Sequence, residues 1–171
     1  HLPVDGVVPG LEHGLDAFTQ TALGAYRGQD LEQRAVFARV DQSDPQRAQL
    51  GAHIALSLAA QSGAALALLG RAPTNDAAVA KTLQRARALG LRHCYVRADV
   101  AVAEDVADAL SAVAADLGPI TAIVHGAGRN EPRVTSELSA ADFETTIGPK
   151  VIGLRNILRC VDPDRLRLLT A

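Results

Sequence analysis

The chain has 171 residues, of which 48% are hydrophobic and 21% charged, with a formal net charge of −2. This composition excludes an intrinsically disordered protein, and the nearly balanced charge gives no electrostatic basis for nucleic acid or an anionic membrane as a partner. No apolar run reaches the roughly 18 residues that a membrane-spanning helix needs, so no membrane segment is expected. The two cysteines, Cys94 and Cys160, lie in apolar stretches without metal-ligand spacing. We therefore expect buried, reduced thiols in a cytoplasmic protein, and no metal site.

The first 34 residues differ in pattern from the rest of the chain. Residues 1–14 carry two prolines and three glycines, and residues 15–26 show only rough helical spacing of apolar side chains. We expect residues 1–34 to form an N-terminal arm or linker, and residues 35–171 to form the main domain. No basic and apolar leader of the secretory type is visible at the start.

From Ala35 onward, strand-like and helix-like stretches alternate along the chain. The last helix is predicted to begin at Ser139 as its cap and to bend near Gly148 and Pro149. This alternation predicts βαβ units and a parallel sheet. The fold class is therefore α/β, a Rossmann-like doubly wound sheet, with a flavodoxin-like fold as the alternative. Strands are predicted over residues 35–40, 64–70, 92–100, 120–126 and 165–171, and helices over residues 45–61, 75–89, 104–117 and 139–160.

Ligands of open parallel sheets bind at the carboxyl ends of the strands, so the residues that follow each strand are candidates for a site. Arg71 follows the second strand, where a basic side chain can hold a 2′-phosphate and favours NADPH over NADH; taken alone, it is more simply a solvated arginine at a turn. Asp99 follows the third strand and could accept a hydrogen bond from adenine or cap the next helix. Small residues at 125–128 follow the fourth strand, where they let a ligand approach the backbone or form an ordinary tight turn.

Several stretches together carry a resemblance to a known family. They are LALLGR at residues 66–71, YVRADV at 95–100, IVHGAG at 123–128 and a PKVxGxxN pattern at 149–156. In this order and at these distances, they resemble the ketoreductase domains of modular type I polyketide synthases, members of the short-chain dehydrogenase/reductase superfamily. The resemblance runs from about Ala52 to the end of the chain.

The resemblance implies NADPH-dependent reduction of a β-ketoacyl group carried on the phosphopantetheine arm of an acyl carrier protein, beside neighbouring synthase domains. It implies that Arg71 contacts the 2′-phosphate and that Asp99 and Val100 hold the adenine. Lys150 matches the family's active-site lysine, which would lower the pKa of a tyrosine and sustain a proton relay; without the resemblance, Lys150 would be interpreted as a solvated helix lysine. The residues implied to line the ribose and nicotinamide are His125, Gly126, Ala127 and Gly128.

The turn before the first helix departs from the family pattern. Residues 44–50 occupy the place of a glycine-rich phosphate turn, yet they contain none of its glycines. Asp44 and Pro45 suit a helix cap and a first helical position, and Pro45 has no N–H to offer a phosphate. Arg47 would compensate only in part. The stretch is therefore predicted to start a helix well and to bind a pyrophosphate poorly.

A second departure concerns the serine and tyrosine that polarise and protonate the carbonyl in this family. Both come after the strand predicted at 165–171, and the chain's tyrosines, Tyr26 and Tyr95, are not in place to donate that proton. The sheet is thus expected to be incomplete on its C-terminal side, with an open edge and uncovered apolar surface.

Two hypotheses follow. In the first, the chain is a β-ketoacyl reductase domain, or part of one, that is inactive without residues outside this sequence. In the second, it is a degenerate, non-catalytic reductase-like domain that serves as a scaffold or interaction surface within the synthase. Binding of NADPH distinguishes the two hypotheses.

Overall fold

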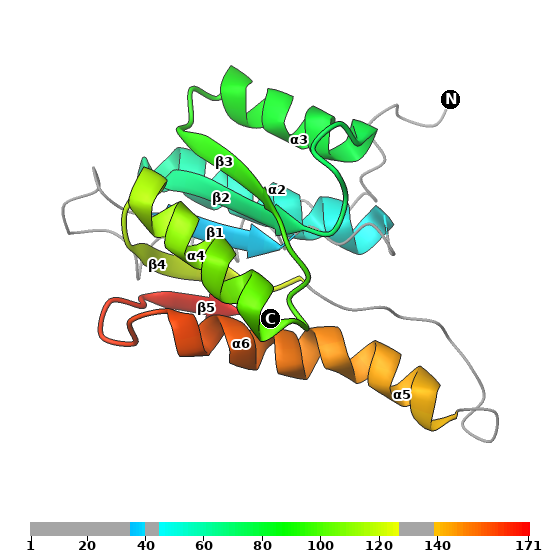
Figure 1. Cartoon of the computed structure of the whole chain (residues 1–171). Coiled ribbons are helices and arrows are strands. Elements are labelled where there is room, and N and C mark those ends of the chain that lie inside the picture. Colours follow the sequence, from blue (N-terminus) through cyan, green and yellow to red (C-terminus); the bar gives the residue numbers. More distant parts are fainter. Residues whose placement is uncertain (1–34, 40–44, 127–138) are drawn as a thin grey trace, which may run out of the picture.

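The computed structural model describes residues 35–39, 45–126 and 139–171. They form a five-stranded sheet with all neighbouring strands parallel, flanked by helices on both faces (Figure 1). The predicted arm at residues 1–34 lies outside the described residues. The strands are β1 (Ala35–Arg39), β2 (Ala65–Gly70), β3 (His93–Arg97), β4 (Ile120–Val124) and β5 (Leu168–Thr170).

The order of the strands decides between the two folds that the sequence left open. The order is β3-β2-β1-β4-β5, which places β1 at the centre. This is the Rossmann order, whereas a flavodoxin-like sheet would run 2-1-3-4-5. The chain reverses direction across the sheet between β1 and β4, so the crevice expected to bind a ligand lies at the carboxyl ends of these two strands.

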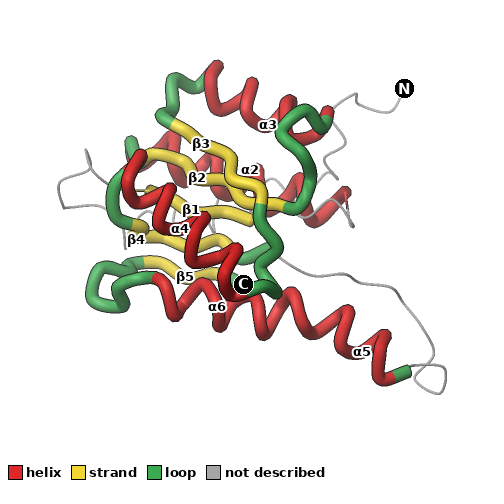
Figure 2. The backbone as a smooth tube through the Cα atoms, in the orientation of Figure 1, coloured by secondary structure: helices red, strands yellow, loops and turns green. Residues whose placement is uncertain are grey.

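Helices connect successive strands and cover both faces of the sheet, as the tube in Figure 2 shows. In the described part of the chain, none of them is long and apolar enough to cross a membrane. At the place where the sequence predicts a bend of the last helix, a π-helical turn, η2, separates α5 from α6. The helical segments are α2 (Pro45–Ser62), α3 (Ala77–Ala88), α4 (Ala103–Leu117), α5 (Ala140–Ile147), η2 (Gly148–Ile152) and α6 (Gly153–Cys160).

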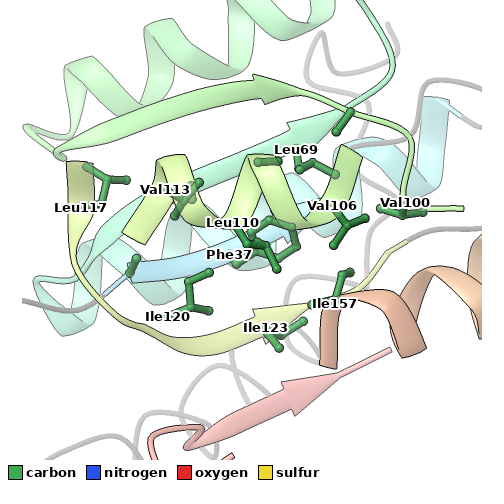
Figure 3. Close-up of a cluster of buried hydrophobic side chains, with 14 of the residues drawn as sticks. Phe37, Leu69, Val100, Val106, Leu110, Val113, Leu117, Ile120, Ile123 and Ile157 are labelled. Atoms are coloured by element: carbon green, nitrogen blue, oxygen red, sulfur yellow. The ribbon is translucent and has the colours of Figure 1, made fainter. Parts of the chain in front are cut away.

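Alternating residues of the central strands build two hydrophobic clusters, one on each face. Val36 and Ala38 of β1 point toward α2, while Phe37 between them points toward α4 and α6. Helices cover both faces of β1, β2 and β4. This explains why the sequences of these strands are continuous apolar runs. Figure 3 shows the α4 side, where Phe37 lies among Leu69, Leu110 and Ile157. One apolar stripe of α4 is buried in this cluster: Val106, Leu110, Val113 and Leu117.

Side-chain caps fix several helix boundaries. The cap predicted at Ser139 is present, as part of a capping box: its hydroxyl accepts from the Asp142 N–H at 3.1 Å, and the Asp142 carboxylate accepts from the Ser139 N–H at 3.1 Å. Helix α3 begins two residues later than predicted, because the Asp76 carboxylate accepts from the N–H groups of Ala78 and Val79. Strand β3 ends at Arg97, earlier than predicted, because the chain turns at Asp99.

The two cysteines have different environments, and the prediction that both are buried is wrong for Cys160. Cys160 is exposed at the end of α6, where the chain turns into solvent, whereas Cys94 lies half-buried in β3. Both thiols are free. Burial, with a smaller contribution from the negative charge of Asp116, raises the pKa of Cys94 to about 11.

This raised pKa predicts a pH dependence of stability. Since the unfolded thiol ionises near pH 9.0 and the folded one near 11, the unfolded chain releases its proton first. The contribution of Cys94 to stability should therefore fall as the pH rises through that window. This contribution is measured by urea unfolding of the wild type and of Cys94→Ala at several pH values. The two free energies of unfolding should converge or cross as the pH rises. A difference that stays constant across the window would contradict the assignment.

Candidate functional site

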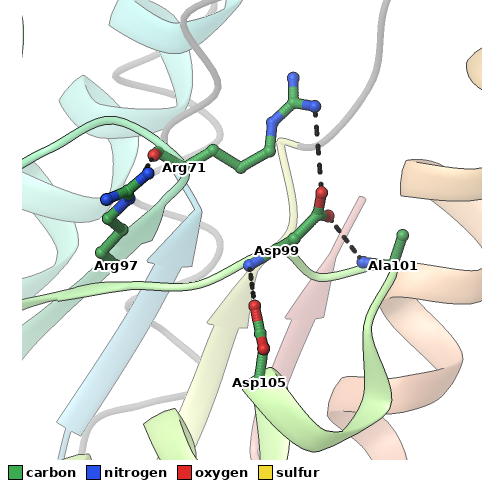
Figure 4. Close-up of polar contacts among 5 residues, drawn as sticks. All are labelled: Arg71, Arg97, Asp99, Ala101 and Asp105. Carbon is green, nitrogen blue, oxygen red and sulfur yellow. Dashed lines mark hydrogen bonds and ion pairs between the residues drawn. The ribbon is translucent and has the colours of Figure 1, made fainter.

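The residues predicted from the ends of β2 and β3 meet at the carboxyl edge of the sheet. The Arg71 guanidinium and the Asp99 carboxylate form an ion pair, with Nη1 and Oδ2 4.0 Å apart (Figure 4). The two side chains keep 49% and 36% of their surface exposed. An exposed ion pair at this distance contributes about 0–1 kcal/mol to stability.

Hydrogen bonds hold the backbone around this pair. The second oxygen of Asp99, Oδ1, accepts from the Ala101 N–H at 2.9 Å, and the Asp99 N–H donates to the Asp105 carboxylate at 3.1 Å. Arg97 Nε donates to the carbonyl oxygen of Arg71 at 3.0 Å and so ties the ends of β2 and β3 together. The Asp99 side chain stabilises the turn before α4 but does not cap that helix, whose N-cap is Val102 with no side-chain hydrogen bond. Its Oδ2 atom faces Arg71.

Val100, predicted to contact adenine, has a fully buried side chain in the hydrophobic cluster beneath α4. Its carbonyl oxygen accepts a buried hydrogen bond of 2.9 Å from Asn156 Nδ2 on α6. Val100 therefore exposes neither its side chain nor its backbone at this edge of the sheet. The supporting role of Asn156 was missed, although a polar residue on the inner side of α6, next to Gly153 and Ile157, is a usable signal.

His125 follows β4 and is only 4% exposed. Its backbone N–H donates to the carbonyl of Thr170 at 2.7 Å, and its ring Nε2 lies 3.1 Å from the carbonyl oxygens of both Pro149 and Lys150. The ring is therefore directed into the protein, toward η2. Gly126, the next residue, is partly exposed. Ala127 and Gly128 lie outside the described residues, as do Asp44 and the rest of 40–44.

Lys150 lies in η2, the π-helical turn between α5 and α6. It lines an open groove of about 460 Å³ with Val151, Leu154 and Leu158 of the same helical segment. Val151 is 57% exposed, and Leu169 of the edge strand β5 is 43% exposed, so apolar surface is uncovered here, as expected. The structure gives no contact between Lys150 and the Arg71–Asp99 pair.

Two further predictions concern tyrosine and metal. The Tyr95 hydroxyl donates to the Ala72 carbonyl at 2.7 Å, and burial, with the charge of Asp76, raises its pKa. The hydroxyl group of Tyr95 therefore stabilises the backbone that follows β2. Within the described ranges, no group of three or more histidine, cysteine or acidic side chains could hold a metal ion.

Comparison with known proteins identifies the family. The family model described as the KR domain matches residues 47–171. The chain belongs to the KR domain family. Relatives of this KR domain include polyketide synthase GfsA of Streptomyces halstedii, 32% identical over 117 residues, which make up 68% of this chain and 2% of the synthase. Another is the highly reducing polyketide synthase AN6791 of Emericella nidulans, 30% identical over 118 residues, or 67% of this chain and 5% of that protein.

Solved structures support the same fold. A short-chain alcohol dehydrogenase from Sinorhizobium meliloti has a TM-score of 0.65 at 24% identity, and the match covers 77% of this chain and 49% of that one. The citronellol catabolism dehydrogenase AtuB of Pseudomonas aeruginosa has a TM-score of 0.62 at 23% identity, with 77% and 50% covered. The KR domain described here thus has the short-chain dehydrogenase/reductase fold. It spans about half the length of these structures and a few per cent of the synthases.

Proposed function

We propose that this KR domain supplies the cofactor-binding part of a polyketide synthase ketoreductase that reduces a carrier-protein-bound β-ketoacyl group with NADPH in the cytoplasm. The observation that carries the proposal is Arg71, whose half-exposed guanidinium extends over the carboxyl edge from the end of β2. A cation at this place suits the 2′-phosphate that distinguishes NADPH from NADH. The chain matches only a small part of each polyketide synthase relative. This supports neighbouring synthase domains and an acyl carrier protein as its partners.

The residues present fit one end of the cofactor. Arg71 would hold the 2′-phosphate, and Asp99, which precedes the buried Val100, would accept a hydrogen bond from the adenine amino group. Residues at 126–128 would lie along the ribose and nicotinamide. Bound NADPH supplies the hydride for carbonyl reduction. Lys150 would act as a cation that stabilises an ionised proton donor and passes a proton toward the new alkoxide.

A non-catalytic role is the second candidate, and one observation favours it. Helix α2 begins at Pro45, and a proline has no N–H to donate to a pyrophosphate at the helix N-terminus. A domain with this helix start could keep the fold while serving only as a scaffold or an interaction surface in the synthase. Calorimetric titration with NADPH separates the candidates, since the scaffold should bind neither NADPH nor NADH.

Arg71 should determine the preference for NADPH. Replacing it with alanine removes one charge-assisted contact to the 2′-phosphate, so the ratio of NADPH to NADH affinity should fall by about tenfold, corresponding to the roughly 1.5 kcal/mol of such a bond. Affinities for both cofactors are measured by calorimetry.

Arg92→Ala is the matched control for this experiment. Arg92 is also exposed, but it precedes β3 at the opposite edge of the sheet, where its Nη2 donates to the Asp116 carbonyl at 2.7 Å. The control should leave the NADPH preference unchanged. An unchanged preference in Arg71→Ala would remove Arg71 from the site.

A further inference from the structure

We propose that His125 is a positioning residue for Lys150: its ring N–H holds the carbonyl groups of η2 and thereby fixes where the lysine side chain leaves the helix. This inference rests on the proposed role of Lys150 and deepens it. Its basis is the pair of contacts that Nε2 makes, 3.1 Å to the Pro149 oxygen and 3.1 Å to the Lys150 oxygen. Carbonyl oxygens only accept hydrogen bonds, so Nε2 carries a hydrogen and donates to both.

The π-helical turn has a particular need for an outside donor. In a regular α-helix, the N–H of Gly153 would donate to the Pro149 carbonyl four residues earlier. Here it donates to the carbonyls of Gly148 and Lys150 instead. The Pro149 oxygen thus loses its regular partner, and His125 supplies a donor in that place. The ring nitrogen therefore stabilises the widened turn rather than an ordinary helix.

The sheet holds the His125 ring in position. His125 follows β4 directly and donates its backbone N–H to the Thr170 carbonyl of β5 at 2.7 Å. The side chain is 4% exposed, and a Cβ atom on Gly153 would lie 3.4 Å from its Cε1 atom. The ring is thus enclosed between the sheet and the helical segment. If the ring moved away, the carbonyl groups of Pro149 and Lys150 would lose their hydrogen bonds to His125, and η2 would no longer be held at Lys150.

A second contact holds the next turn of the helix but does not act on Lys150 directly. Asn156 Nδ2 donates to the Val100 carbonyl at 2.9 Å, from the inner side of α6. The helical segment is therefore held at two places, at η2 by His125 after β4 and in α6 by the turn between β3 and α4. These two hydrogen bonds add to the packing of Ile157 and Gly153 against the α4 side of the sheet.

The sequence offers a direct experiment, because Lys81 and Lys150 are its two lysines. Labelling lysine carbonyl carbons with ¹³C gives one NMR signal for each, and Lys81, in α3, is the internal control. His125→Met removes the donor at similar side-chain length, whereas His125→Gln keeps an amide N–H near the place of Nε2. In His125→Met, the Lys150 carbonyl signal should move upfield while that of Lys81 stays. In His125→Gln, both signals should stay near their wild-type positions.

A second readout follows the side chain itself. With lysine labelled at Cε, addition of NADPH should shift the Lys150 signal in the wild type and in His125→Gln, and this shift should be lost in His125→Met. An unmoved Lys150 carbonyl in His125→Met would overturn the proposal. So would parallel changes at Lys81 and Lys150, or no rescue by glutamine, since these indicate a general loss of structure. If the wild type shows no response to NADPH, the proposed function fails, and the carbonyl signals without cofactor still decide whether His125 positions Lys150.

Discussion

Replacing Phe37 with alanine should lower the free energy of unfolding by about 3–5 kcal/mol, the usual cost of truncating a buried phenylalanine. Phe37 is fully buried at the centre of the sheet, under α4 and α6. Close packing on every side prevents the cavity from collapsing. Because a domain of this size is stable by only about 5–15 kcal/mol, the loss would be a large part of the total. Urea denaturation followed by circular dichroism measures it.

Phe37→Leu is the control for this experiment. It keeps an apolar side chain at the same place and leaves a smaller cavity than alanine does, so the loss of stability should be clearly smaller than in Phe37→Ala. Equal losses in the leucine and alanine variants would show that the cavity is not the cause. A small loss in Phe37→Ala would mean that this side of the sheet is less tightly packed than the burial of Phe37 indicates.

A second large effect is expected at Gly153, the first residue of α6. A Cβ atom there would lie 2.6 Å from Val100 Cγ2 and 3.0 Å from Val100 Cβ. Val100 is fully buried and branched at Cβ, so it cannot move aside. Gly153→Ala should therefore lose about 2 kcal/mol by overpacking, more than the roughly 1 kcal/mol that alanine gains over glycine in a helix. The free energy of unfolding is again the measurement.

Two variants make the Gly153 prediction specific. Gly148 also lies in helical backbone, with φ −49°, but a Cβ atom there meets nothing within 4 Å. Gly148→Ala should therefore cause no loss. Adding Val100→Ala to Gly153→Ala should cost less than the sum of the two single changes, because it removes the clashing methyl group. Additive losses in the double variant would show that Val100 is not the obstacle.

The fold could be predicted to a large extent because its strands are buried on both faces. Apolar runs such as residues 64–70 carry little periodicity but end at glycine or at a charged residue, which marks them as strands of a parallel sheet. The order of the strands could not be predicted from such runs, since it depends on which helix covers which face. The burial of Cys160 was predicted wrongly because an apolar context in sequence does not show which side of α6 a residue occupies.

The site was predictable where it depends on strand ends and unpredictable where it depends on packing. Arg71 and Asp99 are brought together because parallel strands end at one edge. The direction of the His125 ring could not be foreseen, since its partners lie 24 and 25 residues later, in a turn whose π-helical form depends on contacts with the sheet.

The central place of β1 has a consequence for the way the chain folds during synthesis. Strand β1 pairs with β2 on one side, where Val36 lies beside Leu66, and with β4 on the other, where it lies beside Ala122. As the chain leaves the ribosome, β1, β2 and β3 can assemble before β4 has been synthesised. During that interval β1 is an edge strand, with a row of unpaired backbone groups and Phe37 not yet covered by α4. The arrival of α4 and β4 closes this edge, so a pause in translation before residue 120 should increase aggregation of the nascent chain.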